Sequence, residues 1–374
     1  MKILADQNMP LVEEYFSDIG NVVRFDGRNL SPEAVRDADV LLVRSVTPVN
    51  AELLKQAVKL KFVGTATIGI DHVDTELLSQ RQIAFSSAPG CNAIAVAEYV
   101  ISTLFAFSQE LNEPLSGKKI GIIGLGNIGE CLRHKLAALD VELLLCDPVR
   151  HEQGSLDEHI DIDTLLTEAD IITCHVPLVK TGAHATKHLL SEKRLAKLKP
   201  GTIVVNASRG DVIDNQALLH LMQRGLGLEL ALDVWENEPN IALDLLPFVR
   251  FASVHIAGHT LEGKARGTEM LYQALSRLVG FQPDKTLTQF LPNPALDKCT
   301  ISNEFEMTDL GRLVHLIYDV RRDDGLLRRN ITTKGFDYLR KNYPVRREFS
   351  TLAVECNTLQ ASTLAQLGFT TRPI

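Results

Sequence analysis

The chain of 374 residues is longer than one ordinary domain, and its 45% hydrophobic and 23% charged residues are typical of a soluble globular protein. A net charge of −8 argues against a nucleic acid or an anionic membrane surface as partner. The six cysteines are scattered, without a CxxC pair or metal-ligand spacing, so we expect reduced thiols in a cytoplasm and no metal site.

The first hundred residues are predicted to form a separate α/β unit. Apolar runs of strand length lie at 2–5, 40–43 and 61–64, and helical spacing appears at 10–19 and 51–58. Two of the strands run into polar residues, and ligands of open parallel sheets lie beyond the carboxyl ends of strands. Arg44, Ser45 and Thr67 are therefore candidates for binding an anionic substrate. Ordinary loop capping explains each of them, taken alone, equally well.

A long apolar stretch follows at 93–108. Glu98, Ser102 and Thr103 interrupt it, so we expect a buried helix rather than a membrane span. Residues 118–147 then combine an apolar strand, a glycine turn, an amphipathic helix, a second apolar strand and a terminal acid. This order is that of a dinucleotide-binding unit.

The glycine turn has the sequence GLGNIG. Its first glycine permits the tight turn, the second lets the backbone approach a pyrophosphate, and the third lets the helix pack on the strand. The N-terminus of the helix offers unpaired N–H groups to phosphates. A turn that uses glycine only for packing is the alternative. The candidate cofactor-binding residues of the turn are Gly124, Gly126, Asn127, Ile128 and Gly129.

Asp147 ends the second strand of this unit. A carboxylate at that position accepts hydrogen bonds from the ribose hydroxyls and repels the 2′-phosphate of NADP, which favours NAD. Arg150 lies nearby in the sequence and leaves the preference open.

The α/β alternation continues after Asp147. Strands are expected at 170–174, 202–205, 228–232 and 251–254, and helices at 162–167, 191–198, 214–223 and 262–281. Such alternation implies a parallel sheet covered on both faces. After Pro292 and Pro294 we expect a small α/β appendage with a helical apolar stripe at 310–320 and a strand at 351–354. It is more basic than the rest of the chain and is interpreted as an oligomerisation or lid element.

Three residues that suit hydride-transfer chemistry fall at successive strand ends. Arg209 could clamp a carboxylate with two parallel hydrogen bonds. His255 suits proton transfer near neutral pH, and Glu238 beside it would stabilise the imidazolium. A surface ion pair, a solvated loop acid and a satisfied strand-end histidine are the respective structural alternatives. His175 is expected to line the cofactor cleft without a chemical role.

Five linked motifs resemble the D-isomer-specific 2-hydroxyacid dehydrogenases over about residues 1–285. They are GLGNIG with Asp147, HVPL at 175–178, NASRG at 206–210, DVWENEP at 233–239 and HIAGHT at 255–260. The resemblance implies that Arg209, Glu238 and His255 are catalytic, with His255 the proton donor in the reducing direction. It also places Val176, Ala207, Ser208, Arg209, Asp233 and Gly258 near the cofactor.

Further motifs extend the resemblance over nearly the whole chain: DQNMP at 6–10, VRSVT at 43–47, GTATIGIDHVD at 64–74, APGCNAIAVAEYV at 88–100, HIAGHTLEGKARGT at 255–268 and RLVHLIYDVRRDD at 312–324. They are similar to the branch of the family that oxidises 4-phospho-D-erythronate to 3-hydroxy-2-oxo-4-phosphobutanoate with NAD, on the bacterial route to pyridoxal phosphate. The similarity implies that Ser45, Thr67 and His259 contact the substrate. Gln7 stands where the branch usually has glutamate, a change that removes a charge distant from the named motifs and is expected to be minor.

The resemblance also implies an organisation with two parallel sheets. Residues 1–95 and 256–285 would form a flavodoxin-like substrate-binding domain, residues 96–255 a Rossmann NAD-binding domain, and residues 286–374 a small α/β domain that joins a homodimer. Part of the phosphate site is hypothesised to come from Arg346–Arg347 or Arg321–Arg322. These pairs could equally be interface or surface charges.

Two other functions stay open from the sequence. One is a related dehydrogenase, such as a 3-phosphoglycerate dehydrogenase or a hydroxypyruvate reductase. The other is an NAD-sensing regulatory protein of the same fold, since a fold alone does not determine activity.

Overall fold

The computed structural model describes residues 1–301 and 305–373, apart from the side chains of Leu359 and Pro373. The chain forms two compact units, Met1–Asn92 with Thr260–Asn293, and Ala93–His259 with Pro294–Ile374. The C-terminal segment therefore packs in the same unit as the sheet that carries the glycine turn. The roles predicted for the parts, substrate binding at 1–95 and 256–285 and dimerisation at 286–374, stay predictions.

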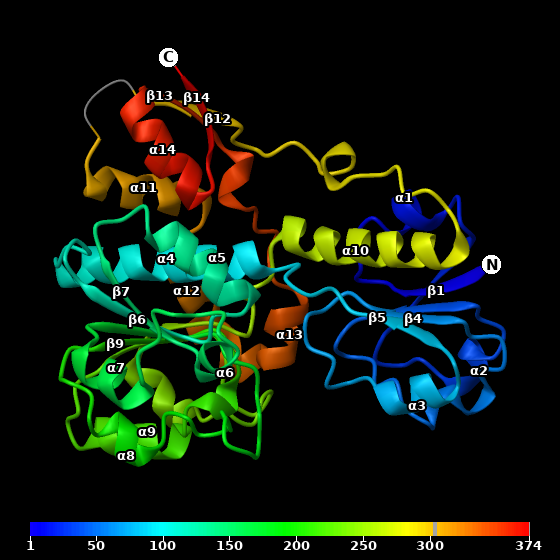
Figure 1. Cartoon of the computed structure of the whole chain (residues 1–374), viewed down its shortest axis with the longest axis horizontal. Coiled ribbons are helices and arrows are strands. Elements are labelled where there is room, and N and C mark those ends of the chain that lie inside the picture. Colours follow the sequence, from blue (N-terminus) through cyan, green and yellow to red (C-terminus); the bar gives the residue numbers. More distant parts are fainter. Residues whose placement is uncertain (302–304, 374) are drawn as a thin grey trace. The chain divides into compact units, whose positions relative to one another are not determined.

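The first unit contains a five-stranded parallel sheet in the order β2-β1-β3-β4-β5 (Figure 1). This is the flavodoxin-like order, as predicted. The strands are β1 (Lys2–Asp6), β2 (Asn21–Phe25), β3 (Val40–Val43), β4 (Phe62–Thr65) and β5 (Ala84–Ser86). The helices are α1 (Val12–Phe16), α2 (Pro32–Val35), α3 (Thr75–Gln80) and α10 (Leu261–Val279), with 3₁₀ turns at Leu53–Gln56 and Leu287–Gln289.

Both faces of this sheet are buried, which explains why its central strands are apolar throughout. Successive side chains of a strand point to opposite faces. Leu41 and Val43 of β3 therefore join one hydrophobic cluster, while Val40 and Leu42 join another that includes Tyr272 of α10. The predicted strands lie within one or two residues of those observed, but the helix expected at 51–58 is only a 3₁₀ turn, and β2 and β5 were not predicted.

The second unit contains a six-stranded parallel sheet in the order β11-β10-β9-β8-β6-β7. A single bridge from Leu145 to His159 adds a minimal strand beside β7, which completes the order of dinucleotide-binding sheets. Strand order reverses between β6 and β8, where such sheets bind ligands. The strands are β6 (Lys119–Ile123), β7 (Glu142–Cys146), β8 (Ile171–Cys174), β9 (Ile203–Asn206), β10 (Glu229–Leu232) and β11 (Val249–Ala252). Their helices are α5 (Asn127–Leu136), α6 (Pro148–Glu152), α7 (Ile162–Glu168), α8 (Glu192–Leu195) and α9 (Asn215–Gln223), with 3₁₀ turns at Gly210–Val212 and Leu243–Phe248.

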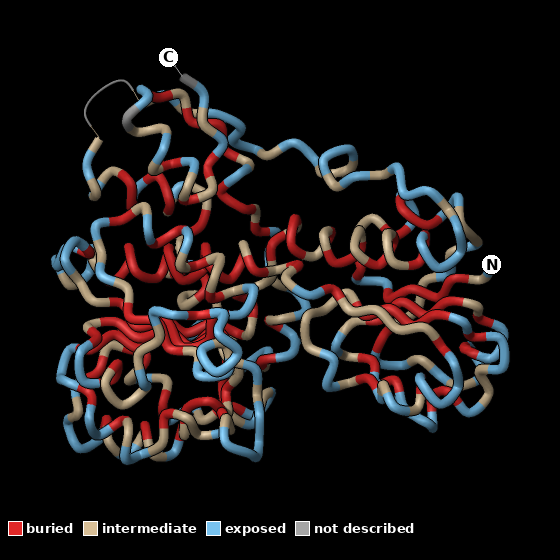
Figure 2. The backbone as a smooth tube through the Cα atoms, in the orientation of Figure 1, coloured by how far each residue is buried: buried red, intermediate tan, exposed pale blue. Residues whose placement is uncertain are grey.

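Helix α4 (Ala93–Leu111) opens the second unit and is its most buried helix, as Figure 2 shows. By length and composition alone it could cross a membrane, but 72% of its apolar window is buried inside the fold. The predicted buried helix is therefore confirmed. Glu98, Ser102 and Thr103 are buried with the apolar residues.

The C-terminal segment adds a small parallel sheet in the order β12-β13-β14. Its elements are β12 (Lys298–Thr300), α11 (Met307–Ile317), α12 (Val320–Lys334), α13 (Phe336–Lys341), a 3₁₀ turn at Phe349–Thr351, β13 (Ala353–Cys356), α14 (Thr358–Leu367) and β14 (Thr370–Pro373). The single apolar stripe expected at 310–320 is divided between α11 and α12. Tyr318 leaves the helical conformation, and Ser102 of α4 accepts from the Val320 amide and donates to the Tyr318 carbonyl at 3.2 and 2.9 Å.

Helix α12 covers the edge of the larger sheet. Asp324 accepts a hydrogen bond from the Ala252 amide of β11 at 2.9 Å, and Arg328 donates to the carbonyls of Leu246 and Val249. Backbone groups of an edge strand otherwise remain open to another chain. The C-terminal segment is thus built into the second unit.

Candidate active site

The glycine turn has the geometry that its sequence predicts. Gly124 has φ of 92°, and a β-carbon there would lie 2.9 Å from the His175 carbonyl oxygen. A β-carbon on Gly129 would lie 2.0 Å from the Gly124 carbonyl oxygen, which only glycine avoids. Around Gly126, by contrast, a β-carbon would meet no described atom within 4 Å. The turn therefore leaves open space at the position where a pyrophosphate is expected.

Helix α5 starts from this turn without a side-chain cap. Gly126 is its N-cap, and Gly126 and Asn127 are exposed while Ile128 is half-buried. The first N–H groups of a helix lack partners within the helix and carry partial positive charge. This end of α5 therefore fits an anionic diphosphate.

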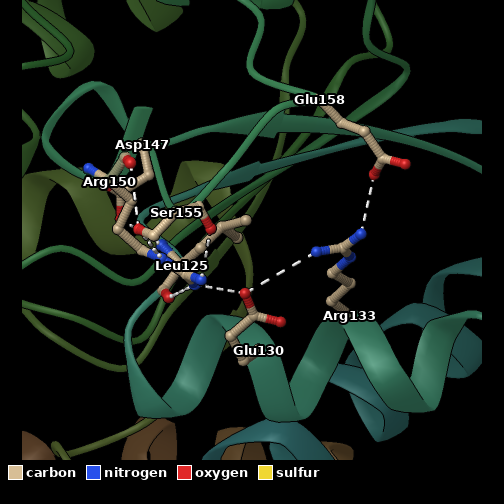
Figure 3. Close-up of polar contacts among 7 residues, drawn as sticks. All are labelled: Leu125, Glu130, Arg133, Asp147, Arg150, Ser155 and Glu158. Carbon is tan, nitrogen blue, oxygen red and sulfur yellow. Dashed lines mark hydrogen bonds and ion pairs between the residues drawn. The ribbon is translucent and has the colours of Figure 1, made fainter. Parts of the chain in front are cut away.

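Asp147 braces the turn from the end of β7, as Figure 3 shows. One of its carboxylate oxygens accepts from the Leu125 amide at 2.8 Å, and the other accepts from the Arg150 amide at 3.1 Å as the N-cap of α6. The Arg150 guanidinium donates to the Leu125 carbonyl at 2.6 Å and pairs with Glu130. Because Arg150 is engaged by these groups, its charge is compensated, and the arrangement favours NAD over NADP.

His175 follows β8 on the other side of the reversal in strand order. Its side chain is buried, and Nε2 lies 2.9 Å from the Thr173 hydroxyl. Burial lowers the pKa of His175 to about 3, so the imidazole is neutral at physiological pH. Val176 lies beside it, with Cγ1 2.8 Å from the position of a β-carbon on Gly124. Both residues thus line the glycine turn, and neither carries charge there.

The loop after β9 carries Arg209. Asn206 orders it by accepting from both the amide and the hydroxyl of Ser208, at 3.1 and 2.8 Å. Ala207 is buried, and the Arg209 guanidinium is partly exposed and donates to the Ser208 carbonyl at 2.8 Å. Gly210 has Trp235 directly against it, so this loop packs on the one after β10.

Asp233 organises the segment that follows β11. Its carboxylate accepts from the Ser253 hydroxyl at 2.6 Å and from the amides of Ile256 and Ala257 at 2.7 and 2.9 Å. The next residue, Gly258, is half-buried. Asp233 is itself buried, so its charge is held by these three donors. The sequence predicted Asp233 as a cofactor residue, and the structure adds that it positions the backbone beside His255.

Glu238 and His255 are in contact, as the sequence predicts for these two candidate residues. The Glu238 carboxylate and His255 Nδ1 are 2.7 Å apart, and the other carboxylate oxygen accepts from the Trp235 amide at 2.9 Å. With Nδ1 donating to Glu238, Nε2 is the nitrogen left for a substrate. Arg209, Glu238 and His255 follow the adjacent strands β9, β10 and β11, so the predicted arrangement at successive strand ends is confirmed.

In the first unit, Ser45 and Thr67 lie at the same edge of the sheet. Val43 pairs with Thr65 across β3 and β4, and each candidate lies two residues beyond that pair. Ser45 is exposed and Thr67 is half-buried. Gln7 follows β1, the neighbour of β3, so the expectation that this change is distant from the candidate residues is wrong.

A chain of hydrogen bonds orients Thr67. Its hydroxyl donates to the Gly69 carbonyl at 2.9 Å, Thr65 Oγ1 lies 2.7 Å from Thr67 Oγ1, and His72 Nε2 lies 2.9 Å from Thr65 Oγ1. Because a carbonyl only accepts, the single hydroxyl proton of Thr67 is used on Gly69, and the Thr65 hydroxyl must donate to Thr67. The Thr65 proton is then used as well, so His72 Nε2 must donate to Thr65. Thr67 then offers an oxygen lone pair, which suits a substrate hydroxyl. Thr65 and His72 were not predicted from the sequence, although both lie in the GTATIGIDHVD motif at 64–74.

The remaining candidates lie in the second unit. His259 is half-buried, and its ring centre is 6.2 Å from that of Tyr343. Arg346 is buried, and its Nη2 donates to two backbone carbonyls. Arg321 forms an ion pair with Asp319 at 2.8 Å. The interpretation of Arg346 and Arg321 as phosphate ligands thus loses support, because Arg346 is buried and Arg321 is engaged by Asp319. Arg346 and the neighbours Arg322 and Arg347 line a surface pocket of about 700 Å³ in the C-terminal segment.

Residues 99–260 match the NAD-binding domain of the D-isomer-specific 2-hydroxyacid dehydrogenases, and residues 290–368 match DUF3410, a domain of unknown function. Erythronate-4-phosphate dehydrogenase of Pseudoalteromonas translucida is 63% identical over 370 residues, 99% of each chain. The enzyme of the same name from Proteus mirabilis is 50% identical over 371 residues, 99% of each chain.

Solved structures agree on the fold. NAD-dependent formate dehydrogenase from Staphylococcus aureus, in complex with NAD, is 26% identical with a TM-score of 0.60, covering 75% of this chain and 97% of that one. NAD-bound 3-phosphoglycerate dehydrogenase from Entamoeba histolytica is 24% identical with a TM-score of 0.64, covering 77% and 99%. The full-length similarity, together with the glycine turn and the Glu238–His255 pair, shows that the chain belongs to the erythronate-4-phosphate dehydrogenases, within the D-isomer-specific 2-hydroxyacid dehydrogenase family.

Proposed function

We propose that the chain oxidises 4-phospho-D-erythronate to 3-hydroxy-2-oxo-4-phosphobutanoate with NAD, a step toward pyridoxal phosphate. The name shared by the full-length relatives supports the substrate. The structural observation that carries the proposal is the 2.7 Å contact between Glu238 and His255 at the carboxyl edge of the sheet that bears the glycine turn.

The residues divide the reaction between them. Bound NAD supplies the acceptor for the hydride that leaves C2. His255 Nε2 takes the proton of the C2 hydroxyl, and Glu238 stabilises the resulting imidazolium through Nδ1. Arg209 holds the substrate carboxylate and polarises the C2 oxygen. Loss of one hydride and one proton converts the alcohol to the 2-oxo product.

The glycine turn, the N-terminus of α5 and Asp147 would hold NAD. The open space at Gly126 fits the pyrophosphate. Asp147, whose two oxygens accept from the Leu125 and Arg150 amides, would accept from the ribose hydroxyls. Val176, Ala207, Ser208, Asp233 and Gly258 are proposed to line the cofactor beyond the turn. Ser45, Thr67 and His259 are proposed to contact the substrate.

A homodimer joined through the C-terminal segment is part of the proposal. Four large apolar side chains of the described part of this segment are exposed: Leu296 at 39%, Leu316 at 55%, Tyr338 at 50% and Val345 at 79%. Exposed apolar side chains gathered on one segment favour contact with a second copy. Val345→Glu should yield a monomer by light scattering, whereas a dimer of unchanged mass would contradict this interface. None of the six cysteines, all of which are described, forms a disulfide, which supports a reducing, cytoplasmic location.

The decisive experiment offers purified protein NAD with 4-phosphoerythronate, 3-phosphoglycerate or glycerate and follows NADH absorbance from the first turnover. We expect kcat/KM for 4-phosphoerythronate to exceed the others by more than about tenfold, which corresponds to about 1.4 kcal/mol of transition-state discrimination. Preference for 3-phosphoglycerate would assign the chain to a different reaction of the family. Bound nucleotide without any turnover would favour the NAD-sensing alternative.

A further inference from the structure

Arg346 occupies an unusual position for a charged side chain. It is only 5% exposed, and its guanidinium carbon lies 4.0 Å from the centre of the Tyr318 ring. Its Nη2 donates to two backbone carbonyls, those of Ala95 at 2.5 Å and Ala257 at 2.9 Å. One nitrogen therefore joins the first turn of α4 to the segment that carries His255.

The two carbonyls flank the places where the chain passes between its two units. The unit boundaries lie at Asn92/Ala93 and His259/Thr260, so Ala95 and Ala257 are both within three residues of a crossing. Arg346 comes from the C-terminal segment, far from both in the sequence. Arg346 belongs to the second unit, and its two hydrogen bonds connect the two chain segments that lead from this unit to the first.

The backbone of Ala257 is fixed through both of its polar groups. Its N–H donates to Asp233, and the carbonyl of the same residue accepts from Arg346. His255, two residues earlier, has φ of 58°, in the left-handed region that non-glycine residues rarely adopt. Such a conformation persists only where the surroundings enforce it. Asp233 and Arg346 are therefore the groups that hold the segment on which His255 stands.

The stability of the fold alone does not explain this arginine. Within the described chain, neither its Nε nor its Nη1 has a hydrogen-bond partner, although the buried Asp323 and Glu98 attract its charge. Burying a cation with unsatisfied donors remains costly. An apolar side chain stacked on Tyr318 would avoid that cost. What an apolar residue would lack is the pair of hydrogen bonds from Nη2.

We propose that Arg346 is a positioning residue of the active site, through which the C-terminal segment fixes the 255–259 segment for catalysis. The catalytic part of this inference rests on the proposed function, while the structural part does not. In this view the C-terminal segment does more than join two copies, because its removal would release the backbone beside His255.

The test compares Arg346→Met, Arg346→Lys and a control, Arg312→Met. Arg312 lies in the same segment, but its side chain is 76% exposed and pairs only with Asp309 within the described residues. Hydrogen exchange of full-length protein should show the amides of 255–259 exchanging at least about tenfold faster in Arg346→Met. Arg312→Met should match the parent protein, and Arg346→Lys should fall between them because its ammonium can keep one bond.

Activity gives a second readout. With 4-phosphoerythronate, kcat of Arg346→Met should fall by roughly 30-fold or more, while the Kd for NADH and the dimer mass stay within about twofold. If that variant does not fold, Arg346→Lys must show the same selective exchange and kcat loss to a smaller degree. Unchanged exchange at 255–259, or a kcat loss matched by Arg312→Met, would overturn the proposal. If the parent protein itself does not turn over, the proposed function fails, but the exchange experiment still decides the role of Arg346.

Discussion

The Glu238 carboxylate binds His255 Nδ1 at 2.7 Å with one oxygen and the Trp235 amide at 2.9 Å with the other. The acid is therefore held by the backbone of its own loop and orients the imidazole of the neighbouring strand end. In the proposed reaction, His255 Nε2 is then the nitrogen that serves the substrate. The pair acts as a unit in which the carboxylate fixes both the tautomer and the orientation of the base.

Glu238→Gln should separate orientation from charge. A glutamine keeps the shape but stabilises the imidazolium poorly, so kcat should fall by about 100-fold while the Kd for NADH is unchanged. Steady-state NADH formation and fluorescence titration measure the two effects. Glu236→Gln is the matched control, because Glu236 binds His188 and the Asn215 amide instead. Equal losses in the two variants would show that Glu238 has no special role.

Two glycines of the turn should respond differently to alanine. A β-carbon on Gly129 would clash with the Gly124 carbonyl at 2.0 Å, whereas on Gly126 it meets no described atom within 4 Å. Gly129→Ala should therefore lower the free energy of unfolding by about 1–3 kcal/mol. Gly126→Ala should leave it within about 0.5 kcal/mol.

Gly126→Ala should instead weaken the binding of the cofactor. Its new methyl group occupies the space expected for the pyrophosphate, so the Kd for NADH should rise by about tenfold or more. Denaturant unfolding and NADH titration of both variants check the prediction. Normal NADH affinity in Gly126→Ala would place the pyrophosphate elsewhere.

The sequence predicted those features that depend on local pattern. The glycine turn has a fixed spacing. Fully buried central strands such as β9 are continuous apolar runs, so the end of β9 located Arg209. The edge strand β2 was missed because several of its residues are exposed, which removes the apolar signal. β5 has only three residues.

Features that depend on distant contacts were not predictable. The break between α11 and α12 is stabilised by Ser102, 216 residues before Tyr318. Arg346 and Arg347 were interpreted as phosphate ligands or as interface or surface charges, because arginine is seldom fully buried. Arg346 is nevertheless buried and stacks on the Tyr318 ring. The sequence around Ser102 or Arg346 contains no pattern that indicates the contact with Tyr318.

Thr65→Val should weaken substrate binding without touching the cofactor. The Thr65 hydroxyl links His72 to Thr67, and valine keeps its shape while removing the hydrogen bonds. Loss of about 1 kcal/mol of orientation should raise KM for 4-phosphoerythronate by about fivefold, with the Kd for NADH unchanged. Thr103→Val removes a buried hydroxyl that donates to the Tyr99 carbonyl in α4 and should leave KM as it is. An unchanged KM in Thr65→Val would argue against Thr67 as a substrate contact.

Asp323 should make stability depend on pH. Burial raises its pKa to about 6, against the opposing effect of hydrogen bonds from the Tyr318 and Tyr343 hydroxyls at 2.7 and 2.9 Å. The folded chain therefore keeps a proton that the unfolded chain releases near pH 4. This contribution to stability is complete below that pH and is lost as the pH rises through about 6, by up to roughly 3 kcal/mol.

Asp323→Asn isolates that contribution, since an amide oxygen still accepts from both tyrosines but does not titrate. Urea unfolding of both proteins at several pH values between about 4 and 7 gives the free energy of unfolding. The difference between Asp323→Asn and the parent protein should grow in favour of the variant as pH rises, because only the parent must bury a carboxylate. A difference that is independent of pH would mean that Asp323 is ionised throughout, with its charge balanced by the buried Arg346 guanidinium.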